Sequence, residues 1–197
     1  MPGLMDILSS QLSGGKLTEL SKALGADEKT TGNAADTAMT TLVGALARNT
    51  SDTGAAESLH GALARDHDGS ILDNFSALIG GSEERSGQGI LRHVLGSKQP
   101  RVEHALGQTT GMDSGQVTKL LGMVAPMVMG ALGKMQRQEK LDPASVAGLL
   151  GEQSRSIERD SPQAGSLVGK LLDTDGDGDV DVGDLAKHAK GLFGKFF

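Results

Sequence analysis

The sequence predicts an all-α fold, a pseudo-duplicated helical bundle followed by a small C-terminal helix–loop–helix unit. Apolar residues recur at intervals of three and four along most of the chain, and the alternation typical of β-strands is not sustained. The chain has 197 residues with 29 glycines, four phenylalanines and no tryptophan, tyrosine or cysteine. Ala, Leu, Val and Met must therefore fill the core, and disulfide bonds and thiol catalysis are excluded.

The first half of the chain divides into helical segments at glycine pairs and at short polar breaks. Each segment carries apolar residues on one face, as expected for helices that cover a common core. The expected segments are residues 4–12, a helix ending at Gly25, residues 27–48, a short helix carrying Leu59 and Leu63, and residues 71–79.

The second half is expected to contain the central helix of the bundle. Its longest helical stretch begins at an N-cap, Ser114, and is apolar on most of its faces as far as Met135, which is typical of a buried helix. Pro126 lies inside it and is expected to kink it, because proline removes one backbone donor. The neighbouring segments are residues 89–96, a helix opened by Pro100, and a short helix starting at Leu141-Asp142-Pro143.

A weak internal repeat relates the two halves. Asp27 and Asp113 lie 86 residues apart, and so do Gly44 and Gly130. A unit of long helix, turn and short helix is therefore expected twice, with the long helices packed together at their Gly-Ala-Leu segments. The other matching pairs are Ala35–Leu121, Leu42–Val128 and Leu46–Leu132 at 86 residues, and Leu59–Val146, Gly61–Gly148 and Leu63–Leu150 at 87 residues.

Three parts are expected along the chain: a duplicated helical domain over residues 1–154, a linker over residues 155–163, and a C-terminal unit over residues 164–197. Charged residues and Pro162 mark the linker. In the C-terminal unit, an entering helix precedes a polar loop, and an exit helix begins at Leu185.

The loop of this unit carries the clearest chemical motif, twelve residues from Asp173 to Asp184. Aspartates occupy alternate positions, Gly178 allows a sharp turn at position six, and the apolar Val180 stands at position eight. Calcium takes about six to eight oxygen ligands, which carboxylates spaced in this way supply. The sequence therefore predicts an EF-hand-like site with Ca²⁺ as its ion. The expected ligands are Asp173, Asp175, Asp177, Asp179, Asp181 and Asp184.

The charge of the chain supports this interpretation. Six of the 25 acidic residues lie in the loop and the other 19 equal the basic residues in number, so the net charge of −6 equals the charge of the loop. Six neighbouring carboxylates repel one another unless a cation compensates them. A solvated acidic turn without metal is the alternative, but it requires neither Gly178 nor Val180 at its position.

Position twelve departs from the standard EF-hand, because Asp184 stands where glutamate is usual. The shorter side chain leaves the preference between calcium and magnesium open. The loop resembles that of dockerins, in which aspartate is usual at this position. Dockerins carry two such loops, and only one is found in this sequence.

Three further motifs, in residues 68–70, 89–96 and 120–132, carry a family resemblance. They read Asp-Gly-Ser, Gly-Ile-Leu-Arg-His-Val-Leu-Gly and Leu-Leu-Gly-Met-Val-Ala-Pro-Met-Val-Met-Gly-Ala-Leu. Through them, residues 4–150 resemble the YidB-like bacterial family of unknown function, the domain-of-unknown-function 937 group. The resemblance implies a helical fold and no particular activity.

Patterns elsewhere do not predict a second site. Residues 66–71 imitate the middle of an EF-hand loop, but the two end positions are Ala64 and Phe75, so we expect a turn in which Asp68 or Ser70 caps the next helix. The five histidines do not have the sequence spacing of zinc ligands. We expect His93 to be a buried or half-buried structural residue. No convergent catalytic set is visible, so we expect no enzymatic activity. The histidines are His60, His67, His93, His104 and His188.

The stretch from Leu185 to Phe197 holds three of the four phenylalanines, interspersed with lysines. It can pack against the entering helix of its own unit, or dock onto a partner groove or an anionic membrane. We expect a non-enzymatic calcium-binding interaction or scaffold protein that binds a protein partner, or a second copy of itself as a homodimer, through this stretch. The alternative is a peripheral membrane-binding protein anchored by the same residues.

No secretory signal is visible, and the longest apolar run, Leu120 to Leu132, is shorter than the ~20 residues of a membrane span. An acidic chain with few aromatic residues is also a poor candidate for nucleic-acid binding. The expectation is a cytoplasmic protein that does not bind nucleic acid.

Overall fold

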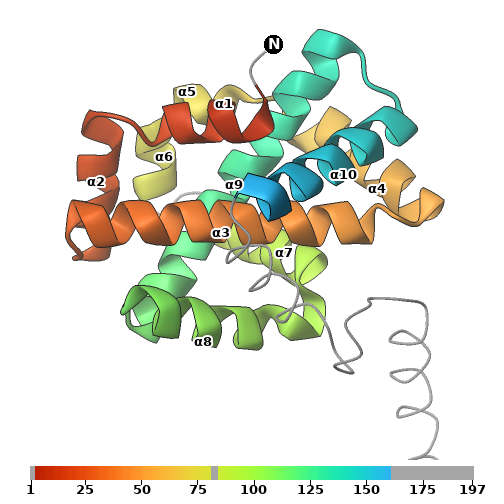
Figure 1. Cartoon of the computed structure of the whole chain (residues 1–197). Coiled ribbons are helices and arrows are strands. Elements are labelled where there is room, and N and C mark those ends of the chain that lie inside the picture. The colour runs from red at the N-terminus through yellow and green to blue at the C-terminus, as the bar shows by residue number, and fades with distance from the viewer. Residues whose placement is uncertain (1–2, 81–83, 161–197) are drawn as a thin grey trace, which may run out of the picture.

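The computed structural model describes residues 3–80 and 84–160, which form ten α-helices and one short 3-10 helix (Figure 1). These residues contain no β-strand, which confirms the all-α class. The helices are α1 Leu4–Gln11, α2 Gly15–Leu24, α3 Glu28–Asn49, α4 Thr53–Asp66, α5 Ser70–Asp73, α6 Phe75–Ile79, α7 Glu84–Val94, the 3-10 helix η1 Gly96–Lys98, α8 Gln99–Thr110, α9 Ser114–Glu139 and α10 Pro143–Asp160.

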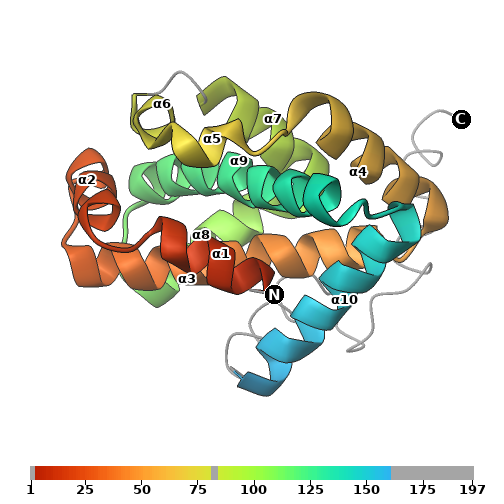
Figure 2. The ribbon, with the colours of Figure 1, turned by 90° about the horizontal axis from the view of Figure 1, so that it is seen from above.

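The centre of the bundle is α9, which contacts α1, α2, α3, α4, α5, α7 and α8 (Figures 1 and 2). Every residue from Leu120 to Gly133 is buried, as predicted for a helix that is apolar on most faces. The helix continues through Pro126. The surrounding helices therefore cover the apolar surface of α9 on all sides.

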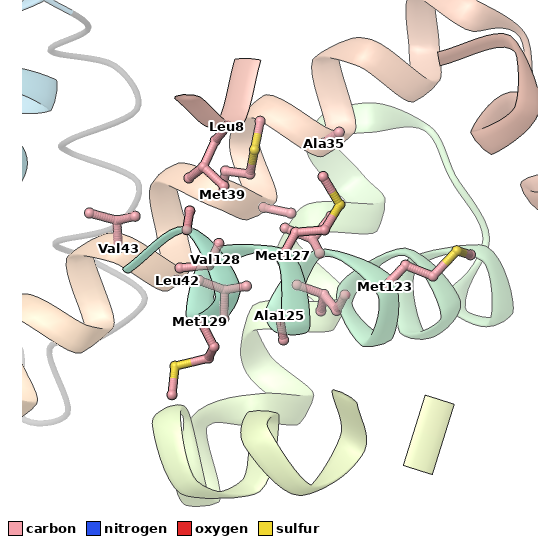
Figure 3. Packing of buried hydrophobic residues seen from close by; sticks show 14 of the residues in the cluster. Leu8, Ala35, Met39, Leu42, Val43, Met123, Ala125, Met127, Val128 and Met129 are labelled. Atoms are coloured by element: carbon pink, nitrogen blue, oxygen red, sulfur yellow. The ribbon is translucent and has the colours of Figure 1, made fainter. Parts of the chain in front are cut away.

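The contact between α3 and α9 shows what fills the core (Figure 3). Met39 of α3, Leu8 of α1 and Met127 of α9 are all buried, and Leu8 and Met39 lie beside each other above α9. Met129 points away from α3, toward the opposite side of the bundle (Figure 3). Flexible methionine side chains fill the irregular spaces that larger aromatic residues occupy in other cores.

The repeat predicted from the sequence is visible in the caps and in the packing. Asp27 and Asp113 are the N-caps of α3 and α9 and accept hydrogen bonds from the amides of Thr30 and Gln116. The α3 helix packs against α9 and α10, and α4 packs against α9 and α10. Each long helix therefore contacts the short helix of the other half, which joins the halves into one core.

The repeat begins one helix earlier than the sequence indicated. Both α2 and α8 end at a glycine in the left-handed conformation, Gly25 with φ 68° and Gly111 with φ 76°. These glycines are also 86 residues apart, and each precedes its aspartate N-cap by two residues. The repeated unit is therefore three helices, α2–α3–α4 and α8–α9–α10.

Several expected boundaries were wrong. The N-cap of α9 is Asp113 and not Ser114, because the Asp113 carboxylate and the Gln116 side chain form a reciprocal capping box. The segment over residues 71–79 is broken at Asn74, whose φ of −115° and ψ of 62° separate α5 from α6. Of the segment expected over residues 89–96, only residues 89–94 are part of α7, which begins earlier, at Glu84.

Two further expectations differ from the structure near α9 and α10. The short helix after Pro143 extends to Asp160, so residues 155–160 of the expected linker are helical, and residues 161–163 lie outside the described part of the chain. The long helices do pack together, but Gly130 of α9 faces the turn at Gly69 and Ile71 rather than α3. The absence of a Cβ atom at Gly130 lets this turn approach closely.

Candidate functional site

The predicted calcium ligands lie outside the described residues. The linker end, the entering helix and the stretch from Leu185 to Phe197 also fall there, so the calcium site stays a sequence prediction. In residues 3–80 and 84–160, no three His, Asp or Glu side chains are grouped so that they could hold a metal ion. The ligands in question are Asp173, Asp175, Asp177, Asp179, Asp181 and Asp184.

The turn that imitates an EF-hand loop is a structural turn, as expected, but the N-cap of α5 is Gly69 rather than Asp68 or Ser70. The Asp68 carboxylate accepts hydrogen bonds from the Ser70 amide at 2.9 Å and from the Ser70 hydroxyl at 2.5 Å. These bonds, together with Arg137, whose Nη1 lies 3.9 Å from the carboxylate, lower the pKa of Asp68. Arg137 also donates to the carbonyl oxygens of Ala64 at 3.1 Å and of Asp68 at 3.4 Å, which ties the end of α4 and the turn to α9.

The described histidines are structural or exposed. His60 Nε2 lies 3.0 Å from the carbonyl oxygen of Leu141, and the His60 carbonyl accepts a hydrogen bond from Gln136 Nε2 at 3.1 Å. This pair of contacts ties α4 to the turn between α9 and α10. The expectation for His93 was wrong, because its side chain is exposed on the outer face of α7 while Leu91 and Leu95 turn inward.

A half-buried polar network joins α7, α8 and α9. The Glu103 carboxylate accepts a hydrogen bond from Gln99 Nε2 at 2.8 Å and another from Thr118 Oγ1 at 3.2 Å. Gln99 also donates to Gln88 Oε1 at 3.3 Å. The negative charge of Glu103 is thus directed toward the bundle rather than toward solvent.

Sequence reasoning missed a group of cations at one corner of the bundle. Two lie in the last turn of α7, and two more lie at η1 and in the first turn of α8, directly after it. The Asn49 amide group donates to the Val94 carbonyl oxygen at 2.9 Å, which brings the end of α3 to the same corner. We call this surface the basic corner. It comprises Arg48, Arg92, His93, Lys98 and Arg101.

The central helix α9 is long and apolar enough to cross a membrane by length and composition. This differs from the expectation, which counted only the run from Leu120 to Leu132. However, 78% of its apolar window is buried inside the bundle, as in the core helix of a globular protein.

These observations define an all-α bundle of two similar three-helix units around a buried central helix. The chain belongs to the DUF937 family of bacterial proteins of unknown function, whose profile matches residues 6–135. No curated protein and no solved structure matches the chain. The family match ends within α9, so the aspartate-rich loop lies beyond the part that the family describes.

Proposed function

We propose that this protein is a non-enzymatic calcium-binding interaction or scaffold protein that holds one Ca²⁺ ion in the loop from Asp173 to Asp184. The observation that carries the proposal is the EF-hand pattern of that loop, with aspartates at alternate positions around the turn glycine Gly178. Calcium orders the loop and fixes the exit helix, which presents the phenylalanine-rich stretch to a protein partner or to a second copy of the chain.

In this proposal, the helical bundle and the C-terminal unit have different roles. The buried apolar residues among those described lie between Leu4 and Leu150, in the part of the chain that precedes the calcium loop. The bundle is the proposed scaffold. Calcium acts on the C-terminal unit, which follows the end of α10 at Asp160.

Isothermal calorimetry with calcium and then magnesium tests the site on the full chain. We expect binding of one calcium ion, abolished in Asp173→Ala and retained in Asp160→Ala, a matched change at an exposed aspartate outside the loop. Equal binding by the two variants would refute the site, and so would the absence of heat with both metals. Light scattering in calcium and in chelator tests whether the ion changes association with a second copy.

The alternative function is peripheral membrane binding, favoured by the three phenylalanines and the lysines Lys187, Lys190 and Lys195 after the loop. Co-sedimentation with anionic vesicles, compared with a chain ending at residue 184, separates the two functions. Binding lost on truncation supports a membrane anchor. Equal sedimentation of both chains argues against it.

A further inference from the structure

We draw no further inference here: the strongest candidate, the half-buried polar network of Gln88, Gln99, Glu103 and Thr118 between α7, α8 and α9, forms its hydrogen bonds among its own members, and nothing in the described residues shows which ligand it would take.

Discussion

Gly87 of α7 lies directly against the backbone of Gly122 of α9. A Cβ atom at Gly87 would overlap the carbonyl oxygen of Gly122, so no other residue fits at this position without moving a helix. Gly87 is buried, and the contact allows α7 to pack closely along the central helix. The glycine is thus required by tertiary packing and not by a turn.

We therefore expect Gly87→Ala to destabilise the protein by about 2–3 kcal/mol, because the two backbones must separate. Gly89→Ala, two residues later in the same helix, is the control. An added Cβ atom there meets no atom of the described residues within 4 Å, and alanine favours a helix, so we expect a gain of about 0.5–1 kcal/mol. Urea unfolding of both variants measures the difference, and similar stabilities would contradict the close contact.

Thr31 is fully buried, and its hydroxyl group has no hydrogen-bond partner among the residues that the structure describes. The matching residue of the repeat, 86 positions later, is Val117, which is equally buried. Thr31→Val should stabilise the protein by about 1 kcal/mol, since it removes an unsatisfied polar group without changing the side-chain shape. Thr41→Val is the matched control.

The Thr41 hydroxyl is also buried, but it donates to the Thr37 carbonyl at 2.8 Å. Its replacement by valine should therefore cost up to about 1 kcal/mol. Thermal or urea unfolding distinguishes the two variants. A loss of stability in Thr31→Val would mean that its hydroxyl is satisfied in solution.

Gln116 links the two halves through its side chain. Its Oε1 accepts a hydrogen bond from the Asp113 amide at 3.0 Å, and its Nε2 donates to the Leu24 carbonyl at 3.0 Å. Gln116→Glu keeps the capping acceptor but places a carboxylate beside that carbonyl. We expect a loss of about 1–2 kcal/mol, measured by urea unfolding. Gln108→Glu, an exposed change of equal charge, should alter stability little, and equal losses in both variants would contradict the link.

Three aspartates close to helix N-termini make the stability depend on acid. Hydrogen bonds from the Thr30 amide, from Ser70 and from Ser145 hold the pKa of Asp27, Asp68 and Asp142 below the ordinary value of 3.8. Because the folded-state pKa is lowered, this stability is present above pH 3.8 and is lost as the pH falls through the lowered values.

The acid dependence is measured by urea unfolding between about pH 2.5 and 6, a range chosen about the aspartate value. In the variant Asp27→Asn, the new amide side chain would still accept the cap hydrogen bond but would not titrate. The variant should therefore lose less stability than the wild type as the pH falls. An identical slope in both proteins would show that the cap does not control the pH dependence.

Much of the fold could be predicted because its signals are local. Aspartate N-caps and terminal glycines act on backbone groups within a few residues, so the positions of α1, α2 and α3 follow from short stretches of sequence. The break at Asn74 and the length of α10 could not be read in this way. They depend on packing against helices that are distant in the chain, such as α3 and α4 for α10.

The two candidate sites differ in the same way: one is formed by consecutive residues, and the other by residues that are far apart in the sequence. The proposed calcium loop could be inferred from the sequence because an EF-hand carries its ligands within twelve consecutive residues, as the aspartates from Asp173 to Asp184 would do. The basic corner was missed because Arg48 is remote in sequence from Arg92 and Arg101. The packing of α3 against α7 and α8, together with the hydrogen bond between Asn49 and Val94, brings these helices together.

By itself, the sequence determined the helical class, the repeat and the spacing of the aspartates in the proposed calcium loop, since each depends on neighbouring residues and periodicity. Only the tertiary structure decided which helices pack together. In it, α10 packs against α3, α4 packs against α9, and the backbone of Gly87 contacts that of Gly122. The physical reason is that close packing is settled between surfaces far apart in the chain, where the shape of both partners counts.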